Sequence, residues 1–444
     1  MSLPLYPNYK DSGVEWLGEV PGHWGASPLK AVATHNDDVL DETTAPDSEI
    51  VYVDISSVDP INGITAKETM LFSAAPSRAR RRVQHGDVIV STVRTYLRAI
   101  ARVRDPEDNL VVSTGFAVVR PGGKLVPDFL GYIVSASYFV EQVIARSTGV
   151  SYPAINASEL VAIPVAVPSL PEQIQIAAFL DRETAKIDEL VAEQRRLMAL
   201  LKEKRQAVIS HAVTRGLNPD APLKPSGIEW LGDVPEHWEI TRVKYHCTVN
   251  GRIGFRGYTT EDQVEEGNGA LVLGATHITQ AGAINLSAPI YLSWEKYYES
   301  PEIMVEPTHI LVVQRGSTCG KVGFVSDDIG AATINPSLVL LKDIGCVGRL
   351  MFYFLSSDLI QGMFQRVLGS TAIPMLSQEQ IGNIPFLLPP VDEQEALIAV
   401  LEKDLGTLDT LTTEAQRAID LLQERRTALI SAAVTGQIDV REAI

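Results

Sequence analysis

Cysteine and basic charge are both scarce in this sequence, and each shortage excludes a class of protein. The three cysteines among 444 residues, Cys247, Cys319 and Cys346, form no CxxC pair. Disulfide scaffolds and structural zinc sites are therefore not expected. The 38 Lys and Arg residues are outnumbered by 55 Asp and Glu residues, which leaves a net charge of −17. A chain that bound nucleic acid over its whole surface would be basic, so only a local basic patch is compatible with this balance.

The sequence also lacks the long apolar runs that a secreted or membrane-bound chain requires. Its first residues include prolines and charges where a signal peptide has an apolar stretch. The most apolar span, residues 129–145, is interrupted by Glu141 and is shorter than the roughly 20 residues of a membrane helix. We therefore expect a cytoplasmic protein in a reducing environment. Apolar residues form 45% of the chain, which is enough for sizeable hydrophobic cores.

Two pairs of similar segments show that the chain is a tandem repeat. Residues 12–24 read SGVEWLGEVPGHW and residues 226–238 read SGIEWLGDVPEHW, with ten of thirteen positions identical; each is named a frame segment below. The second pair, PSLPEQIQIAAFL from residue 168 and PPVDEQEALIAVL from residue 389, lies 221 positions apart. Each half of the chain is thus bracketed by similar segments, whereas the inserts between them differ. This arrangement indicates one scaffold that recognises two different targets.

Both inserts have the pattern of mixed domains that contain helices and strands. Apolar residues recur at helical spacing over residues 129–146 and 350–368. Short β-branched runs bounded by Gly, Pro or Asp predict strands at Glu49–Ile55, Asp87–Ser91, Phe116–Val119, Ile310–Val313 and Leu338–Leu341. Helices among strands indicate a globular α/β or α+β insert in each half.

A long helix is expected after each insert. The first begins near Pro171 and the second near Glu393, and they end at Gly216 and Gly436. Gln194 interrupts the apolar seam of the first helix, either as a polar residue that fixes the register or as a solvated one. Apolar residues at intervals of seven predict a coiled-coil seam made of Leu180, Ile187, Leu201, Val208, Leu401, Leu408, Leu422 and Leu429, with Leu190, Leu197, Leu411 and Ala418 beside it.

The expected partner of each long helix is the other one, because each has an apolar seam to bury. If a pseudo-two-fold axis relates the halves, the helices run antiparallel and the inserts lie at opposite ends of the pair. The chain order is then cyclic, so the two termini should lie close together. The sequence thus predicts a mixed α+β fold, with two α/β globular domains separated by two long antiparallel coiled-coil helices in a pseudo-two-fold tandem repeat. The expected divisions are residues 1–167 for the first domain, 168–217 for the first helix, 218–388 for the second domain and 389–444 for the second helix.

No catalytic motif is recognisable in either half. Residues 335–338 read NPSL and lack the second proline and the aromatic ring of a methyltransferase motif. Residues 315–321 read RGSTCGK, with three residues between the glycines where a phosphate loop has four. His23 and His237 occupy the same position of the two frame segments, and a structural hydrogen bond is the expected role of both. The sequence therefore predicts neither a catalytic residue nor a metal site.

Positive charge is concentrated in parts of the two inserts. Residues 76–104 contain eight arginines and a single acidic residue, Asp87, and residues 240–258 contain no acidic residue. Arginine suits both phosphate groups and the O6 and N7 atoms of guanine. The candidates for DNA contact are Arg78, Arg80, Arg81, Arg82, Arg94, Arg98, Arg242, Lys244, Arg252, Arg256, Arg315 and Lys321.

Each basic cluster has an alternative interpretation as a solvated face. Within the first cluster, Arg102 and Arg104 are expected to pair with nearby acids such as Asp105 and Glu107. The candidates therefore carry weight as clusters more than as single residues.

The two frame segments, and the helices that open with PEQ and DEQ before a leucine-rich seam, resemble the specificity subunit of type I restriction–modification enzymes. The resemblance covers the whole chain. It implies that each insert is a target recognition domain that reads one half of a bipartite double-stranded DNA target. It also implies that the long helices dock two modification (methyltransferase) subunits and set the spacing of the half-sites, and that restriction subunits with ATP-dependent translocase and nuclease activity join this core.

The same resemblance implies a non-catalytic subunit without a cofactor of its own, since S-adenosylmethionine is expected on the methyltransferase subunits. The inserts resemble no recognition domain of assignable sequence, so the DNA target stays open. Two other classes also stay open, a coiled-coil scaffold without enzymatic activity and an enzyme of unknown type with duplicated domains. The unlike, arginine-rich inserts argue against the scaffold, and the absence of catalytic motifs argues against the enzyme.

Independent reading by the two inserts has a direct test. Replacing residues 25–165 by the insert of a related subunit should change one half of the methylated DNA motif and leave the other half intact. The reason is that each insert is expected to have its own core and its own frame segment. Methylation-sensitive long-read sequencing of the host genome measures the motif, and a swap that altered both halves would contradict the prediction.

Overall fold

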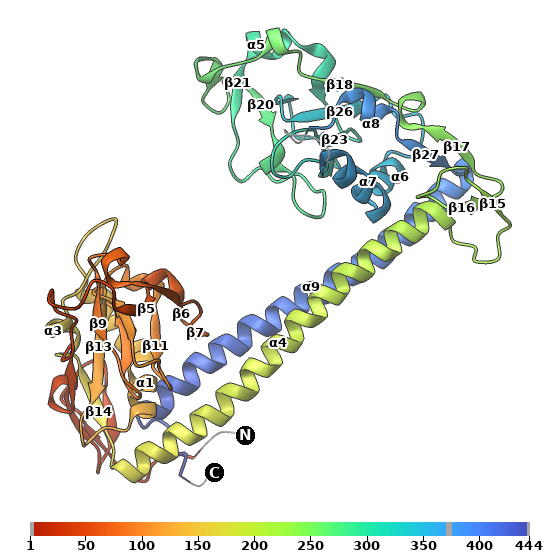
Figure 1. Ribbon diagram of the computed structural model, residues 1–444. Coiled ribbons are helices and arrows are strands. Elements are labelled where there is room, and N and C mark those ends of the chain that lie inside the picture. The colour runs from red at the N-terminus through yellow and green to blue at the C-terminus, as the bar shows by residue number, and fades with distance from the viewer. Residues whose placement is uncertain (1–3, 370–374, 442–444) are drawn as a thin grey trace. The chain divides into compact units, whose positions relative to one another are not determined.

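The computed structural model describes residues 4–369 and 375–441, and the chain falls into two units (Figure 1). The first unit comprises Met1–Arg195 and Gln416–Ile444, and the second comprises Arg196–Ala415. Each unit contains one frame segment, one insert and part of each of two long helices. The mixed α+β fold and the tandem repeat predicted from the sequence are confirmed.

Each frame segment contributes to a short antiparallel hairpin. In the first unit β1 (Tyr9–Asp11) pairs with β2 (Glu19–Pro21), and in the second unit β15 (Leu223–Pro225) pairs with β16 (Asp233–Pro235). The tryptophan that ends each frame segment is buried. The two hairpins lie at equivalent positions of the repeat because the sequences that form them are nearly the same.

The first and last strands of each insert pair with one another and close the domain on itself. β3 (Gly25–Pro28) is antiparallel to β14 (Pro164–Val167), and β17 (Glu239–Arg242) is antiparallel to β27 (Pro385–Leu388). Each insert therefore leaves and rejoins the scaffold at neighbouring points. Two inserts of different sequence can thus be joined to similar scaffolds.

The five strands predicted from β-branched runs are all present, as β5, β10, β13, β23 and β26. The sheet strands of the first insert are β4 (Ala33–His35), β5 (Glu49–Val53), β8 (Glu68–Leu71), β9 (Ala79–Arg82), β10 (Val88–Ser91), β11 (Ile100–Arg102), β12 (Leu110–Ser113) and β13 (Phe116–Pro121). Those of the second insert are β18 (Thr248–Gly251), β19 (Gln263–Val264), β20 (Gly269–Leu273), β21 (Tyr291–Ser293), β22 (Met304–Val305), β23 (Ile310–Val313), β24 (Val322–Phe324), β25 (Ala332–Ile334) and β26 (Leu338–Lys342).

Both inserts arrange these strands in two small sheets of related topology. The strand orders are β11-β10-β13-β4 and β8-β5-β12-β9 in the first insert, and β18-β26-β23-β24 and β19-β21-β20-β25-β22 in the second. One parallel pair recurs in the second sheet of each insert, β5 with β12 and β20 with β25. The faint sequence similarity of the inserts therefore conceals a common framework, and the loops differ between them.

The apolar stretch of each insert that has helical spacing forms two helices. The first pair is α1 (Pro127–Ser135) and α2 (Ser137–Arg146), and the second is α6 (Gly348–Ser356) and α7 (Asp358–Gly369). The residue between the helices of each pair is extended, with ψ of 142° in the first and 148° in the second. The helical structure predicted for both stretches is confirmed, and the break was not predicted because apolar periodicity continues across it.

A serine of a long helix stabilises each of these breaks. The backbone N–H of Ser137 donates to Ser431 Oγ at 3.2 Å, and that of Asp358 donates to Ser210 Oγ at 3.2 Å. Both contacts satisfy an N–H group at the start of a helix, which has no partner within the helix itself. The sequence of the insert alone could not reveal a break that a distant serine stabilises.

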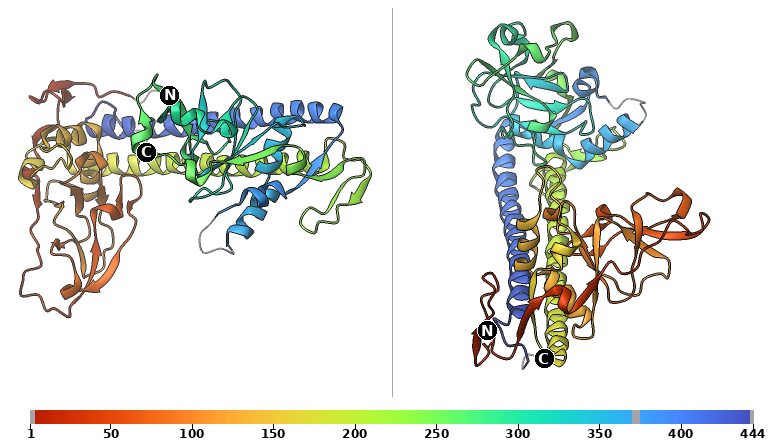
Figure 2. Two further views of the ribbon diagram at one scale, coloured as in Figure 1. Left: turned by 90° about the horizontal axis from the view of Figure 1, so that it is seen from above. Right: turned by 90° about the vertical axis from the view of Figure 1, so that its left-hand side faces the viewer.

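The long helices α4 (Leu170–Arg215) and α9 (Val391–Val434) lie side by side and run antiparallel (Figures 1 and 2). In the first unit the beginning of α4 shares a core with the end of α9, and in the second unit the end of α4 shares a core with the beginning of α9. Each helix stops where expected, at Gly216 and Gly436, which both have a φ of 74°. Within the described residues, no helix is apolar over a length that would cross a bilayer.

The same ion pair occurs twice between the long helices. In the first unit Arg426 Nε lies 3.3 Å from Asp188 Oδ1, and in the second unit Arg205 Nη1 lies 2.5 Å from Asp409 Oδ1. The two arginines are 221 positions apart, as are the two aspartates, so the pseudo-two-fold relation of the repeats extends to these side chains. A shift of one helix by one heptad would separate both pairs, which means that they favour a single register.

The predicted seam residues lie at different depths. Gln194 is half-buried. Five residues are buried, Leu180, Ile187, Leu201, Leu401 and Leu408, and three are half-buried, Val208, Leu422 and Leu429.

Most of the residues expected to flank the seam are exposed and are not buried between the helices. Leu190, Leu197 and Leu411 are 50%, 42% and 48% exposed, and Ala418 is half-buried. A heptad seam alternates steps of three and four residues. The prediction was wrong for the three leucines because it placed the second row of the seam three residues after a seam position. The buried second row lies four residues after one, at Val191, Leu405 and Ile419.

The two ends of the chain meet within the first unit. The backbone N–H of Asp439 donates to the carbonyl oxygen of Pro4 at 2.7 Å, and Tyr9 OH donates to the carbonyl oxygen of Gly436 at 3.0 Å. In the second unit a continuous chain joins the end of α4 to β15 at the corresponding place. The predicted proximity of the termini, and the cyclic order of the repeat, are confirmed.

Burial in the seam contributes measurably to stability. Leu201 is 7% exposed, so Leu201→Ala should leave a cavity and lower the free energy of unfolding by about 2–5 kcal/mol. Leu197→Ala is the matched control, because Leu197 lies one turn earlier on α4 and is 42% exposed; its effect should be within about 0.5 kcal/mol. Urea denaturation followed by circular dichroism measures both variants, and equal losses would show that α4 does not bury this face.

Candidate nucleic-acid interface

A glutamate at the beginning of each long helix binds the frame segment of the same unit. His23 Nε2 lies 3.1 Å from a carboxylate oxygen of Glu172, and His237 Nε2 lies 2.8 Å from one of Glu393. Trp238 Nε1 also donates to Glu393 at 3.1 Å. The histidines thus have the structural hydrogen-bonding role expected from their repeated position.

The first unit adds a buried tyrosine to this contact. Tyr6 OH donates to Glu172 Oε1 at 2.9 Å, and the two residues are only 3% and 4% exposed. Burial, together with the negative charge of Glu172, raises the pKa of Tyr6 well above its usual range. The guanidinium carbon of Arg441 lies 4.9 Å from the centroid of the Tyr6 ring, so both ends of the chain contribute to the same cluster.

The glutamine that follows each glutamate binds the insert. Gln173 Oε1 accepts a hydrogen bond from the backbone N–H of Val126 at 2.8 Å, and Gln394 Oε1 accepts one from Val347 at 3.0 Å. Each amide lies just before the first helix of its insert. The Glu-Gln pair therefore holds frame segment, insert and long helix together. The repetition of this pair is visible in the sequence, but its contacts are not.

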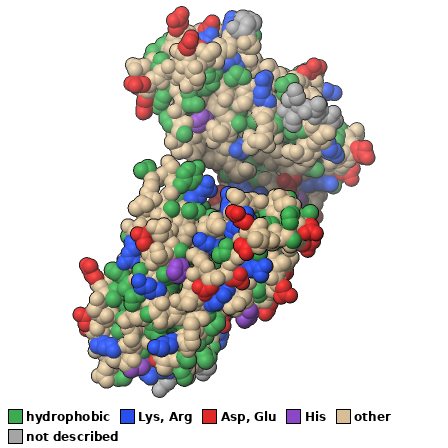
Figure 3. All heavy atoms as spheres, turned by 60° about the vertical axis from the view of Figure 1, so that its left-hand side comes forward, with side chains coloured by type: hydrophobic (Ala, Val, Ile, Leu, Met, Phe, Trp, Pro, Cys, Tyr) green, Lys and Arg blue, Asp and Glu red, His purple; other side chains and the backbone are tan. Residues whose placement is uncertain are grey.

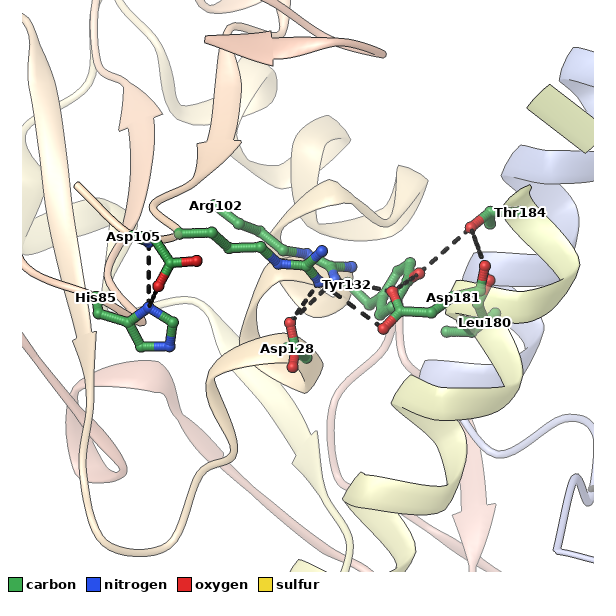
Figure 4. Close-up of polar contacts among 9 residues, drawn as sticks. His85, Arg102, Asp105, Asp128, Tyr132, Leu180, Asp181 and Thr184 are labelled. Atoms are coloured by element: carbon green, nitrogen blue, oxygen red, sulfur yellow. Dashed lines mark hydrogen bonds and ion pairs between the residues drawn. The ribbon is translucent and has the colours of Figure 1, made fainter. Parts of the chain in front are cut away.

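Two arginines of the first basic cluster anchor the insert to α4 (Figure 4). Arg102 Nη1 lies 3.2 Å from Asp181 Oδ1. Arg104 Nη2 lies 3.8 Å from Asp181 Oδ2 and 2.7 Å from Asp128 Oδ1. Tyr132 OH donates to Asp181 Oδ1 at 2.6 Å, and the guanidinium carbon of Arg102 is 3.7 Å from the centroid of the Tyr132 ring. These arginines are neutralised by acids of α1 and α4.

The acids expected to pair with these two arginines have other partners. Asp105 Oδ1 lies 3.3 Å from His85 Nδ1, and Glu107 Oε2 lies 2.7 Å from Lys67 Nζ. The expectation was wrong because Arg102, at the end of β11, and Arg104, two residues later, contact acids of α1 and α4. Proximity along the chain therefore did not identify the partner.

The second unit makes the equivalent link with one ion pair. Arg349 of α6 contacts Glu402 of α9, and its guanidinium carbon lies 5.1 Å from the centroid of the Phe324 ring. Burial, reinforced by the charge of Glu402, raises the pKa of the neighbouring Tyr353. Both inserts are thus held to a long helix by an arginine and a carboxylate, supplied from different elements.

One candidate of the first cluster, Arg81, points into the domain. Its guanidinium donates to the side chain of Asn36 and to the carbonyl oxygen of Phe116. Burial lowers the pKa of Arg81. The side chain stabilises contacts between the sheets of the insert, and we withdraw it as a candidate for DNA contact.

The remaining arginines of β9 and the residue before it are more accessible. Arg78 Nη2 lies 2.8 Å from Asp54 Oδ2. The half-buried Arg80 has its guanidinium carbon 4.8 Å from the centroid of the Phe72 ring, while Arg82 is exposed. β9 is an edge strand, so these side chains border one end of a sheet.

In the second insert, Arg252 is a core residue. It is 7% exposed and donates to the carbonyl oxygen of Ile334 at 3.0 Å and to Thr333 Oγ1 at 2.9 Å. Its role as a candidate for DNA contact is therefore withdrawn as well. Arg256 Nη1 lies 3.4 Å from Glu302 Oε1. An acid-free sequence does not reveal that Arg252 is buried.

Other candidates of the second insert remain accessible. Arg242 and Lys244 are exposed, and Arg242 Nη1 donates to Asn383 Oδ1 at 3.2 Å. Lys321 is half-buried and donates to the carbonyl oxygen of Ile278 at 2.6 Å. These side chains lie on separate segments of the insert.

Two equivalent loops present exposed basic residues. Arg94 and Arg98 lie between β10 and β11, and Arg315 lies between β23 and β24. Each loop is supported by the segment that follows the second helix of its insert, since Arg94 N–H donates to the carbonyl oxygen of Pro153 at 2.8 Å and Arg315 forms a β-bridge with Met375. On the face shown in Figure 3, Lys and Arg side chains are interspersed with Asp and Glu. These local loops are the candidate interface.

Part of the first half of the chain matches a known protein family. Residues 73–196 match the family described as Type I restriction modification DNA specificity domain. The putative type I restriction enzyme MjaX specificity subunit of Methanocaldococcus jannaschii is 21% identical over 463 aligned residues, which cover 96% of each chain. The type I restriction enzyme StySPI specificity subunit of Salmonella potsdam is 22% identical and covers 72% of this chain and 67% of that protein.

Solved structures show the same fold. A chain from a study of complex assembly and conformational transition of the type I R-M system is 23% identical, with a TM-score of 0.73 over 94% of this chain and 98% of that one. The HsdS subunit from Thermoanaerobacter tengcongensis is also 23% identical, with a TM-score of 0.52 at the same coverage. The similarity extends over both repeats and both long helices.

The contact between Glu172 and Tyr6 should be measurable as stability. Glu172→Ala removes the acceptor of a buried hydroxyl and should lower the free energy of unfolding by about 1–3 kcal/mol. Glu189→Ala is the control, because Glu189 is an exposed glutamate of the same helix and its loss should matter by no more than about 0.5 kcal/mol. Thermal unfolding compares the two variants. If Glu172→Ala unfolds at the temperature of the control, the buried contact does not hold the frame segment.

Proposed function

We propose that the chain is a specificity subunit of a type I restriction–modification system, and that each insert reads one half of a bipartite DNA target. The chain is the DNA-recognition component of such a system and not its catalytic one. The observation that carries the proposal is that equivalent loops of the two inserts differ in sequence. The loop after β10 reads Arg94-Thr-Tyr-Leu-Arg98, and the loop after β23 reads Arg315-Gly-Ser-Thr318. Unlike loops on a common framework would read unlike half-sites.

The proposed DNA contacts are the accessible members of the predicted set. Charged side chains that reach phosphate groups supply most of the sequence-independent affinity for DNA. Side chains with a weak surface partner, such as Arg78 with Asp54, can exchange it for a phosphate, because an exposed ion pair contributes little. The set comprises Arg78, Arg80, Arg82, Arg94, Arg98, Arg242, Lys244, Arg256, Arg315 and Lys321.

The proposed partners are two modification subunits that dock on the long helices. Exposed leucines support this surface, since isolated apolar side chains are common on helices but several on one pair favour a protein interface. They are Leu190, Leu197, Leu200, Leu411 and Leu421. In the proposed complex S-adenosylmethionine binds to the modification subunits, this chain holds no cofactor, and restriction subunits join in the cytoplasm. The length of the helix pair is proposed to set the spacing of the half-sites.

The experiment that tests this proposal measures DNA binding of the chain assembled with its modification subunits. Replacing both Arg94 and Arg98 by Ala should weaken binding and lower the slope of log K against log salt by about 0.9 for each phosphate that the variant no longer neutralises. Arg104→Ala is the matched control, because Arg104 lies in the same basic stretch but contacts Asp128. Fluorescence anisotropy at several salt concentrations on DNA that carries the methylated motif gives both quantities. An unchanged slope in the double variant, or an equal change in the control, would contradict the assignment.

A further inference from the structure

The loop between β10 and β11 presents two large apolar side chains to solvent. Tyr96 is 52% exposed and Leu97 is 45% exposed, at the tip of a single 3-10 turn, Thr95–Leu97. The arginines on either side, Arg94 and Arg98, both have the left-handed backbone conformation, with φ of 51° and 53°. Such a conformation is unfavourable for arginine and persists where the surrounding structure imposes it, often at functional sites.

The base of this loop is held firmly, in contrast to its tip. Thr95 is 3% exposed, and its hydroxyl lies 2.9 Å from Ser147 Oγ. Ser91 Oγ donates to the carbonyl oxygen of Val93 at 2.6 Å. The tip is therefore displayed by a rigid support, so its exposure does not result from a loosely packed segment. A pre-ordered apolar tip loses little conformational entropy when it binds.

A second loop extends the same surface. Val150 is fully exposed and Tyr152 is 64% exposed, and the guanidinium carbon of Arg94 lies 4.7 Å from the centroid of the Tyr152 ring. Residues 92–104 and 147–156 contain no acidic side chain. Aromatic and aliphatic groups beside arginines, in segments without an acidic residue, suit a ligand that is anionic outside and apolar inside. Stacked DNA has both properties.

We propose that Tyr96 and Leu97 form a wedge that enters the base stack of the half-site read by the first insert, while Arg94 and Arg98 hold the phosphates on either side. Partial unstacking by apolar side chains is a known way to bend a duplex and to read its deformability. This inference rests on the proposed function and adds its mode of reading.

The equivalent loop of the second insert has no such wedge. Its tip consists of Gly316, Ser317 and Thr318, which are small and exposed. The second insert therefore leaves its half-site stacked at this contact. The two halves of the target are thus read in different ways, one with distortion of the base stack and the other without it.

The test uses the chain assembled with its modification subunits and duplexes that carry 2-aminopurine at single positions of either half-site, away from the methylated adenines. Binding should raise the fluorescence at one step of the first half-site, because the base loses its stacking there, and should not do so in the second. Replacing both Tyr96 and Leu97 by Ala should abolish the increase and weaken binding roughly 10-fold, from the loss of stacking. The salt slope should not change, since both arginines that face the phosphates are retained.

Two further variants keep the result interpretable. The double variant Tyr96→Phe with Leu97→Met preserves an apolar tip and should retain the fluorescence increase. Ile61→Ala, which shortens an exposed apolar side chain of the first insert outside this loop, should leave the fluorescence of both half-sites as it is in the native complex. A native complex that binds its motif without any fluorescence increase in the first half-site would overturn the wedge and leave the specificity function intact. Loss of assembly with the modification subunits in the Ala variant would also overturn it, because the tip would then be a protein interface. A native complex that shows no sequence-selective binding would refute the proposed function itself.

Discussion

The antiparallel pairing of α4 and α9 is the constraint on which the rest of the architecture depends. Each helix has an apolar stripe that water would otherwise cover, and most helical stability in proteins comes from burying such a face. The two pairs of Arg and Asp, Arg205 with Asp409 and Arg426 with Asp188, add a preference for one register. With that register set, the beginning of each helix lies beside the end of the other. Equivalent scaffold elements can then occur in both units.

The Glu-Gln pair at the beginning of each long helix links the insert to the paired helices. Glu172 and Glu393 bind the frame segments, and Gln173 and Gln394 bind the backbone just before the first helix of each insert. Since each insert is also closed by its own first and last strands, its loops are free to vary without disturbing the scaffold. The chain therefore separates residues that determine the shape of the molecule from residues that face a target.

The features shared by both halves were predictable because the sequence segments that form them occur twice in the chain. Strands such as β10 and β23 follow from local β-branched runs, and the helix ends follow from Gly216 and Gly436. The features that escaped prediction depend on contacts between distant segments. The break before α2 needs the hydroxyl of Ser431, and the partners of Arg102 come from α4.

The candidate interface was predictable only as a set of basic segments. Arginine suits a phosphate, an acid or a buried carbonyl group equally well, and the sequence does not say which of these it meets. Arg252 binds the carbonyl oxygen of Ile334 within the core, whereas Arg94 and Arg98 lie on an exposed loop. The apolar tip formed by Tyr96 and Leu97 had no sequence signal, since exposed and buried aromatic residues look alike in a single chain.

The meeting of the chain ends has a consequence for the order of synthesis. The core of the first unit combines Trp24 and Phe179 with Ile430, Val434 and Val440, which the ribosome adds last. The second unit lies within one continuous stretch, Arg196–Ala415, and has all its residues earlier. The domain that emerges first is thus completed last, and in the interval it exposes the apolar surface that the end of α9 will cover. Contacts of such long sequence separation fold slowly and leave intermediates open to aggregation.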